Sequence, residues 1–266
     1  MTEDAPMMRE PGLYDYSPQV DRPKITWPNG ARVAFWVAPN IEYYEYDPPL
    51  SPGRKPWPKP TPDVVPYSHR DYGNRAGFFR MMEVMAKYGV RGSVSLNVAI
   101  CQHHPEIIKV CNELDWEFFS HGIYNTRYTY GMSEAQERAM MKDVIATVKD
   151  ATGQNVDGWL SPALSNTTNT FELLAEFGIQ YSCDLFHDDQ PQPVNTKSGR
   201  LISVPYSLEM NDTVVLTMLG KSSRHYADIL KANFDQLYEE GADSGQVMCI
   251  PLHPFLIGQP HRIGNF

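Results

Sequence analysis

Cysteine is scarce in this sequence of 266 residues, and no long apolar run is present. None of the cysteines forms a Cys-x-x-Cys pair, and each lies in or beside an apolar segment; they are Cys101, Cys111, Cys183 and Cys249. Such scattered cysteines are typical of buried thiols in a reducing compartment and argue against a disulfide framework. Because no segment approaches the ~20 apolar residues of a membrane span, and the acidic N-terminus has no apolar stretch like that of a signal peptide, we expect a cytoplasmic protein without a membrane partner.

Basic residues are also fewer than acidic ones. The chain has 23 Lys and Arg against 32 Asp and Glu, which gives a formal net charge of −9. Nucleic acids and anionic membranes attract proteins through clustered Lys and Arg. The composition therefore argues against both partners and favours a small-molecule substrate.

Short apolar runs rich in Val, Ile, Phe and Trp alternate with amphipathic segments along the chain. Runs of this length and composition favour buried strands, and their alternation with helices favours a parallel sheet. We expect strands at residues 31–38, 92–96, 115–119, 156–160, 179–183, 201–204, 213–216 and 246–252. We expect helices at residues 75–87, 104–114, 133–148, 170–177 and 223–240. The predicted fold class is α/β, a distorted (β/α) barrel that is closed or incomplete.

The length fits one domain, because α/β barrels commonly reach roughly 250 residues. We expect residues 1–30 to form an N-terminal surface arm and residues 31–266 to form a single catalytic domain. Within this domain, residues 43–67 contain eight prolines, which disfavour helices and central strands. Long irregular insertions often serve as lids, so we expect residues 43–67 to cover a pocket.

Three polar clusters follow three of the expected strands. They are Asn40-Ile41-Glu42, Ser120-His121-Gly122 and Leu252-His253-Pro254. Because loops converge at the carboxyl ends of parallel strands, one pocket could collect a carboxylate and two imidazoles. We therefore take Glu42, His121 and His253 as the candidate catalytic residues, against the alternative that each histidine is a structural one.

The order of these clusters resembles the polysaccharide deacetylase (NodB homology) superfamily. Its members usually have an Asp-rich first motif, two histidines four residues apart in the second motif, and Arg-Ser-Pro in the third. Here Asn40 and Glu42 stand in the first motif, and Asn125 stands where the second histidine is expected. Leu160 replaces the arginine before Ser161-Pro162. One histidine, a longer carboxylate and an amide make a poor zinc site.

This altered pattern is similar to that of a branch of the superfamily, the metal-independent allantoinases and, more loosely, the cyclic imide hydrolases. The similarity runs from about residue 22 to residue 262. It includes the stretches Trp27-Pro28-Asn29-Gly30, Tyr72-Gly73-Asn74-Arg75-Ala76-Gly77-Phe78, Asp188-Asp189, Val204-Pro205-Tyr206 and Asn211-Asp212. The resemblance implies a barrel of the polysaccharide deacetylase type, no cofactor and a homo-oligomer, namely a homotetramer. Relatives normally continue with another helix and strand after the last motif, so we expect an incomplete barrel or a truncated chain.

The resemblance also suggests roles for the three candidate catalytic residues. Glu42, shielded from water by the lid, is expected to have a raised pKa and to act as general base. His121 is expected to orient the attacking water or polarise a carbonyl, and His253 to protonate the leaving nitrogen. Without a metal to acidify water, an electrophilic cyclic imide or ureide is an easier substrate than an acetamide. A weak divalent metal at Glu42, His121 and Asn125 remains an open alternative.

Further polar residues near these motifs are candidates for substrate binding. Arg75 could present a bidentate fork to a carboxylate or carbonyl pair, although it could equally be a surface residue, and Asn211-Asp212 could be an ordinary turn. The full set is Asn40, Tyr72, Arg75, Asn125, Ser161, Asp188, Asp189, Tyr206, Glu209, Asn211 and Asp212.

The sequence thus predicts a hydrolase of non-peptide carbon–nitrogen bonds, preferably in cyclic amides, imides or ureides. One alternative is a metal-dependent N-deacetylase of an N-acetylated carbohydrate. A second, from another class, is a non-catalytic carbohydrate-binding or scaffold protein with the same fold.

Overall fold

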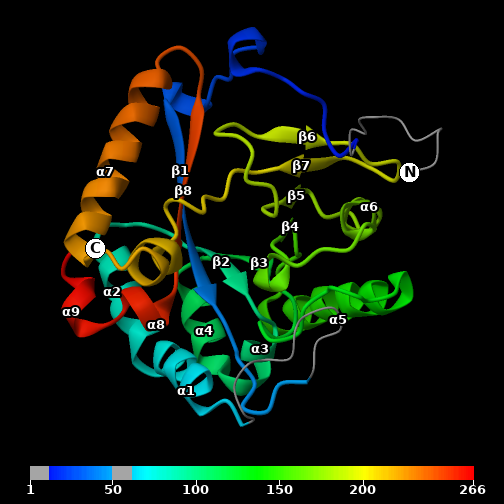
Figure 1. The fold of residues 1–266 in the computed structure, drawn as a ribbon, viewed down its shortest axis with the longest axis vertical. Coiled ribbons are helices and arrows are strands. Elements are labelled where there is room, and N and C mark those ends of the chain that lie inside the picture. The colour runs from blue at the N-terminus through cyan, green and yellow to red at the C-terminus, as the bar shows by residue number, and fades with distance from the viewer. Residues whose placement is uncertain (1–11, 50–61) are drawn as a thin grey trace, which may run out of the picture.

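The computed structural model describes residues 12–49 and 62–266, and these residues form a curved eight-stranded sheet with helices packed outside it (Figure 1). The strand order is β6-β7-β5-β4-β3-β2-β1-β8. All pairs are parallel except β6 with β7. The strands are β1 (Val33–Ile41), β2 (Ser93–Leu96), β3 (Glu117–Ser120), β4 (Gly158–Trp159), β5 (Tyr181–Ser182), β6 (Gln192–Val194), β7 (Leu201–Ser203) and β8 (Gln246–Leu252).

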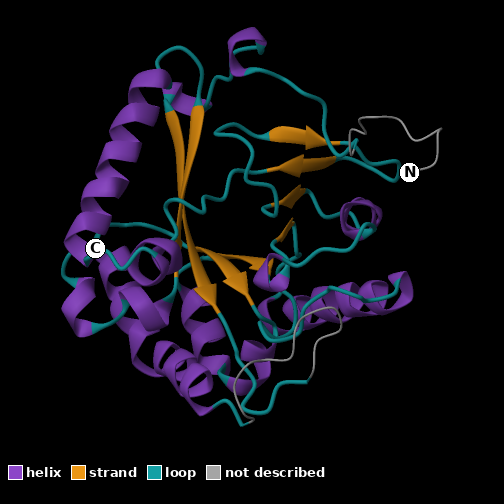
Figure 2. Ribbon diagram, viewed as in Figure 1, coloured by secondary structure: helices purple, strands orange, loops and turns teal. Residues whose placement is uncertain are grey.

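The sheet curls without closing, because no pairing joins β8 to β6 among the described residues. The expectation of a distorted, incomplete barrel is therefore confirmed. Figure 2 shows helices along the outer left and lower sides of the sheet, while the side near β6 and β7 carries mainly loops. The α-helices are α1 (Val64–Tyr72), α2 (Phe78–Lys87), α3 (Ala99–His103), α4 (Pro105–Glu113), α5 (Glu134–Thr152), α6 (Thr170–Glu176), α7 (Ser223–Glu240), α8 (Pro254–Ile257) and α9 (Pro260–Ile263).

Two apolar layers hold the sheet in place. The larger lies between the strands and the outer helices and includes Phe78, Met81 and Met85 of α2. The smaller lies inside the curl and contains Ala38, Phe119, Leu160, Cys183, Tyr206 and Cys249. Because this inner layer fills the space beneath the carboxyl ends of β1, β3 and β8, it supports the loops that follow those strands.

Most expected elements are present, but one expected strand is wrong and one strand was not expected. Residues 213–216, expected as a strand, belong to the π-helical segment Thr213–Met218. Asn211 Oδ1 accepts the backbone N–H of Thr213 at 2.8 Å, which favours the start of a helical turn over the β-propensity of the Thr-Val-Val run. Strand β6 was not expected at all.

The proline-rich segment also ends earlier than expected. Residues 50–61 lie outside the described part of the chain, but α1 already begins at Val64. Pro66 lies in its first turn, where a missing N–H leaves no helical hydrogen bond unmade. The expectation of a non-helical chain through residue 67 is therefore wrong for residues 64–67.

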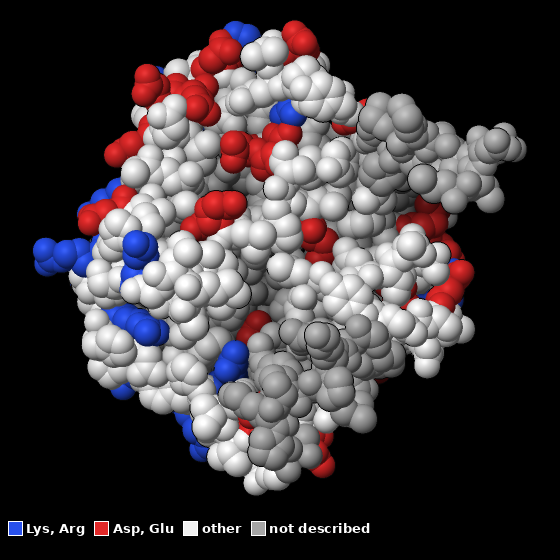
Figure 3. All heavy atoms as spheres, viewed as in Figure 1, with Lys and Arg blue, Asp and Glu red and all other residues white. Residues whose placement is uncertain are grey.

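Three of the four cysteines are buried, and all four are free thiols. Within residues 12–49 and 62–266, no helix has the length and apolar content needed to cross a membrane. On the face shown in Figure 3, acidic side chains are spread over the upper part and basic ones gather at the lower left edge. This face therefore presents no continuous basic surface.

Candidate active site

The three candidate catalytic residues converge at the carboxyl ends of β1, β3 and β8. Glu42 Oε1 lies 3.5 Å from His121 Nε2 and 3.5 Å from His253 Nε2. All three residues are buried, with exposures of 6% for Glu42, 4% for His121 and 8% for His253. The parallel register explains this convergence, because it brings the residues that follow the three strands to the same edge of the sheet.

Two asparagines fix the backbone around this group. Asn97 Nδ2 donates to the carbonyl of His121 at 2.5 Å, and its Oδ1 accepts the N–H of Tyr43 at 3.0 Å. Asn74 Nδ2 donates to the carbonyl of Glu42 at 2.9 Å. These bonds satisfy buried backbone groups just past the strand ends, where no ladder partner remains.

Asp212 holds the ring of His253. Its carboxylate accepts the backbone N–H of His253 at 2.8 Å and Nδ1–H at 2.6 Å. Burial alone lowers the pKa of His253, but the charges of Asp212 and Glu42 and their hydrogen bonds outweigh burial and raise this pKa to about 10. His253 is therefore an imidazolium at neutral pH, with Nε2–H directed toward Glu42.

The pKa of Glu42 is lowered, so the expectation of a raised value is wrong. Burial raises this pKa, but the charge of His253 and the contacts with both imidazoles overcome the effect and bring it well below the usual range. Glu42 is consequently a carboxylate at neutral pH. Its second oxygen, Oε2, is buried and has no hydrogen-bond partner in the described residues. A buried carboxylate oxygen without a partner is a natural acceptor for a bound water or substrate.

His121 presents a lone pair to the same carboxylate. Its Nδ1 lies 3.1 Å from the carbonyl of Leu160, which can only accept, so Nδ1 carries the proton. In the neutral ring, Nε2 is then an acceptor that faces Glu42 Oε1 at 3.5 Å. Two acceptors at this distance repel each other unless they share a donor. The pair is therefore suited to binding a water molecule that lies beside it and donates its hydrogens.

A cavity of about 220 Å³ opens onto these residues. Its wall includes three amides, Asn40, Asn125 and Asn211, together with Tyr206. Tyr206 Oη donates to Asn40 Oδ1 at 3.0 Å, and Asn125 Nδ2 donates to Tyr44 Oη at 2.6 Å. The rest of the wall is largely apolar and includes Leu160, Leu164, Val214, Met218 and Phe255. A pocket of this size and lining suits a small ring compound.

Of the expected substrate-binding residues, Asn40, Asn125, Tyr206 and Asn211 line this cavity. Asp212 lies directly behind His253. Ser161 is also behind the wall, where its N–H and hydroxyl donate to Asp184 at 2.7 and 2.9 Å.

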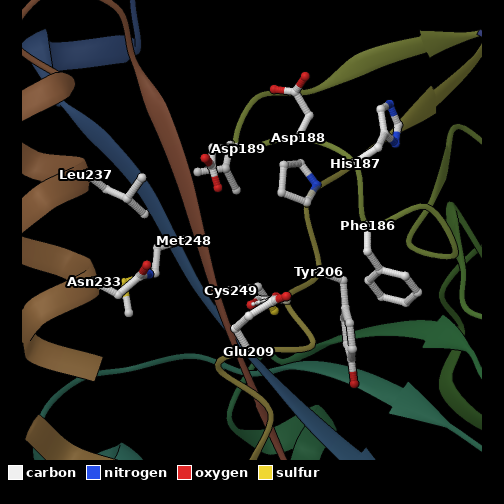
Figure 4. Close-up of a pocket in the computed structure, with 13 residues that line it drawn as sticks. Phe186, His187, Asp188, Asp189, Tyr206, Glu209, Asn233, Leu237, Met248 and Cys249 are labelled. Atoms are coloured by element: carbon white, nitrogen blue, oxygen red, sulfur yellow. Dashed lines mark hydrogen bonds between the residues drawn. The ribbon is translucent and has the colours of Figure 1, made fainter. Parts of the chain in front are cut away.

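The remaining five residues lie outside the cavity. Tyr72 Oη accepts from Arg80 at 2.5 Å, and Arg75 is 71% exposed in an ion pair with Asp71. Asp188 binds Arg22 of the N-terminal arm. Asp188, Asp189 and Glu209 line a second cavity with Asn233 of α7 and Cys249 of β8 (Figure 4). Tyr206 lies in the walls of both cavities and separates them.

Asp184, which no motif indicated, is a further buried acid behind the wall, where it accepts hydrogen bonds from Ser161. Burial raises the pKa of Asp184 to about 6 despite the hydrogen bonds from Ser161. Because this folded-state pKa lies above the unfolded value, the contribution of Asp184 to stability is greatest below that unfolded value and is lost as the pH rises through about 6.

We therefore expect Asp184→Asn to become more stable relative to the wild type as the pH rises from 4 to 7. The amide keeps the shape and cannot ionise, so the relative free energy of unfolding should change by roughly 2 kcal/mol. Urea unfolding of both proteins at several pH values measures this change. A difference that does not vary with pH would contradict the raised pKa.

The residues of the site do not fit the metal centre usual for this arrangement of motifs. Within residues 12–49 and 62–266, no three His, Cys, Asp or Glu side chains are grouped as metal ligands. Asn125 Oδ1 already accepts the N–H of Ala163 at 3.2 Å, so its oxygen is engaged. An amide is in any case a weak ligand for a transition metal. We derive no step through a metal.

Comparison with known proteins agrees with this fold and set of motifs. Residues 59–182 match the family model "Polysaccharide deacetylase". A protein of Schizosaccharomyces pombe that carries the name of a polysaccharide deacetylase is 26% identical over 89% of this chain and 82% of its own length. A peptidoglycan deacetylase of Helicobacter pylori is 27% identical over 57% of this chain and 51% of its own length.

Two solved structures are similar over almost the whole chain. The allantoinase PuuE is 28% identical, with a TM-score of 0.81 over 94% of this chain and 89% of that chain. A protein of Pseudomonas aeruginosa PAO1 assigned to the polysaccharide deacetylases is 29% identical, with a TM-score of 0.80 over 92% of this chain and 85% of that chain.

Proposed function

We propose that the chain, whose residues 59–182 match the polysaccharide deacetylase family model, hydrolyses a non-peptide carbon–nitrogen bond, preferably in a cyclic amide, imide or ureide. The observation that carries this proposal is the arrangement around Glu42. One oxygen of Glu42 is buried without a partner, and the other faces two imidazoles, one with a free lone pair and one protonated. Such a group can take a proton from water and return one to a departing nitrogen, which amide hydrolysis requires.

In this mechanism, Glu42 and His121 together hold the attacking water. The water donates one hydrogen to Glu42 and the other toward His121 Nε2, so that its oxygen lone pair faces the substrate carbonyl. As the oxygen attacks the carbonyl carbon, its proton passes to Glu42. The low pKa of Glu42 makes it a weaker base than a carboxylate with a raised pKa. The contribution of positioning is correspondingly larger.

His253 acts at the other end of the scissile bond. Its Nε2–H donates a proton to the ring nitrogen as the C–N bond of the tetrahedral intermediate breaks. Asp212 keeps the donor oriented and stabilises its charge before transfer. The pKa of His253, about 10, keeps its imidazole protonated across the neutral range.

The preference for a ring follows from the electrophile that this chemistry needs. A water activated by a carboxylate and an imidazole attacks an imide or ureide carbonyl more readily than an acetamide, and the ring nitrogen is a better leaving group. The similarity to an allantoinase structure supports this preference. The names of the S. pombe and H. pylori relatives favour the alternative, an N-deacetylase acting on an N-acetylated carbohydrate.

We also propose that the protein is cytoplasmic and forms a homo-oligomer, namely the homotetramer expected from the resemblance. Light scattering of the purified protein measures its oligomeric state.

We expect the purified protein to carry less than one equivalent of any transition metal and to keep its activity in chelator. The reason is the chemistry of the site, in which Glu42 Oε1 lies against two imidazoles and Asn125 Oδ1 accepts a backbone N–H. Elemental analysis, together with turnover of hydantoins, imides and N-acetyl sugars before and after chelation, tests this. One equivalent of metal, removed together with activity, would favour the N-deacetylase alternative.

A further inference from the structure

Arg70 of α1 lies in the wall of the catalytic cavity, and it is the one Lys or Arg among the described residues that line it. Its guanidinium carbon lies 4.3 Å from the centre of the Tyr44 ring and 4.6 Å from that of Phe255. Tyr44 is bound by Asn125, and Phe255 follows His253 on α8. Two rings that are tied to the site thus hold the position of the guanidinium.

The hydrogen-bonding capacity of Arg70 is unused within the described residues. Its Nε is buried and has no partner. Arg22, Arg127 and Arg138, in contrast, each form an ion pair with a carboxylate. The acid in the same cavity, Glu42, lies against the two imidazoles instead. A partly buried guanidinium without a counterion is costly, and contacts with aromatic rings offset only part of that cost.

We propose that Arg70 binds a carboxylate carried by the substrate, in addition to the scissile amide. A carboxylate matches the planar guanidinium edge with two oxygens and supplies the missing negative charge, whereas a neutral carbonyl leaves the charge uncompensated. The cavity of about 220 Å³ limits the substrate to a small ring with one short acidic substituent. This inference rests on the proposed function, since it names the substrate class of the same site.

The test compares two rings of nearly the same shape, hydantoin-5-acetate and its neutral analogue hydantoin-5-acetamide. We expect the wild type to prefer the acetate by about 10- to 100-fold in kcat/KM, the value of a charge-assisted bidentate contact. Arg70→Gln should remove this preference, so that the kcat/KM values on the two rings come within about threefold of each other. Arg70→Lys should keep part of it, because the charge remains but the fork is lost.

The matched control is Arg75→Gln, a change five residues along in an exposed arginine that pairs with Asp71. It should leave the preference unchanged. An equal loss on both rings in Arg70→Gln would overturn the proposal, because it would indicate a contact with the reacting carbonyl. A preference that survives in Arg70→Gln would overturn it as well. Thermal unfolding of Arg70→Gln and Arg70→Lys shows whether each variant is folded.

Calorimetric binding of hydantoin-5-acetate separates this inference from the proposed function. Binding that weakens at least tenfold in Arg70→Gln supports the role of Arg70 even when neither ring is hydrolysed, a result that would remove the hydrolase proposal alone. Absence of binding to the wild type at millimolar concentration, or equal binding to both proteins, would count against Arg70 as a carboxylate site.

Discussion

The Glu42→Gln variant should lose roughly 10²–10⁴-fold in kcat while remaining folded, because the amide keeps the shape of the side chain but cannot take a proton from water. The loss has a second source. The charge of Glu42 is one of the causes that raise the pKa of His253. In the variant, the alkaline limb of the pH profile of any residual activity should therefore move to lower pH, since His253 loses its proton more easily.

Glu45→Gln provides the control for this substitution. It makes the same chemical change three residues further along, in a side chain that pairs with Arg127 outside the cavity. Its kcat should stay within about twofold of the wild type, as usual for a change away from the reacting groups. If Glu42→Gln also retains near wild-type kcat with a native unfolding temperature, Glu42 has a structural role and the mechanism is wrong.

The second large effect concerns His253. His253→Ala should lose more rate on a dihydrouracil ring, whose nitrogen is a poor leaving group, than on an imide, whose nitrogen leaves as a stabilised anion. A good leaving group needs less protonation in the transition state, so the ratio of the two rates should widen in the variant. The loss on the poor leaving group should reach about 10²-fold or more.

Initial rates on both rings, for the wild type and His253→Ala, measure this ratio. His261→Ala is the control, because His261 is exposed on α9 and is not part of the cavity wall. His253→Ala leaves the buried Asp212 without its imidazole partner. His253→Gln therefore serves as a second variant, because it keeps a polar side chain next to Asp212. An equal loss on both rings would indicate a role in binding or in orienting the carbonyl instead of proton donation.

The arrangement of the three central residues could be predicted from the sequence because it depends on the strands. Parallel pairing of β1 with β2 and β8, and of β2 with β3, fixes the edge at which their carboxyl ends lie. Any residue directly after those strands must lie near that edge. Glu42, His121 and His253 satisfy this condition, and Asn40, near the end of β1, lines the same cavity.

The charge state of the site could not be read from the same pattern. The expectation of a raised pKa for Glu42 considered burial and not the protonated His253 beside it. Asp212, which makes His253 a stable cation, was expected only as a substrate ligand or part of a turn. Its position depends on the π-helical segment Thr213–Met218, which has the composition of a strand.

Arg70 and Asp184 were missed for a similar reason. Arg70 follows no predicted strand. Asp184 directly follows the strand expected at residues 179–183 but stands alone between Cys183 and Leu185. The importance of both depends on side-chain contacts between distant elements. Arg75 and Tyr72 were favoured because they lie in a stretch that resembles a known family. The helical turn directs Arg75 to Asp71 and Tyr72 to Arg80, away from the cavity. A motif identifies the segment near a site but not which of its side chains enters the cavity.

The central claim, hydrolysis of a ring C–N bond by the residues around Glu42, is tested most directly by one comparison on chelator-treated protein. The initial rate of hydantoin or imide ring opening is measured beside the rate of acetate release from an N-acetyl sugar, at equal substrate concentration. The account predicts ring opening that depends on Glu42 and is unaffected by chelation, with little or no acetate release. Acetate release that requires added metal, without ring opening of any hydantoin or imide tested, would contradict it.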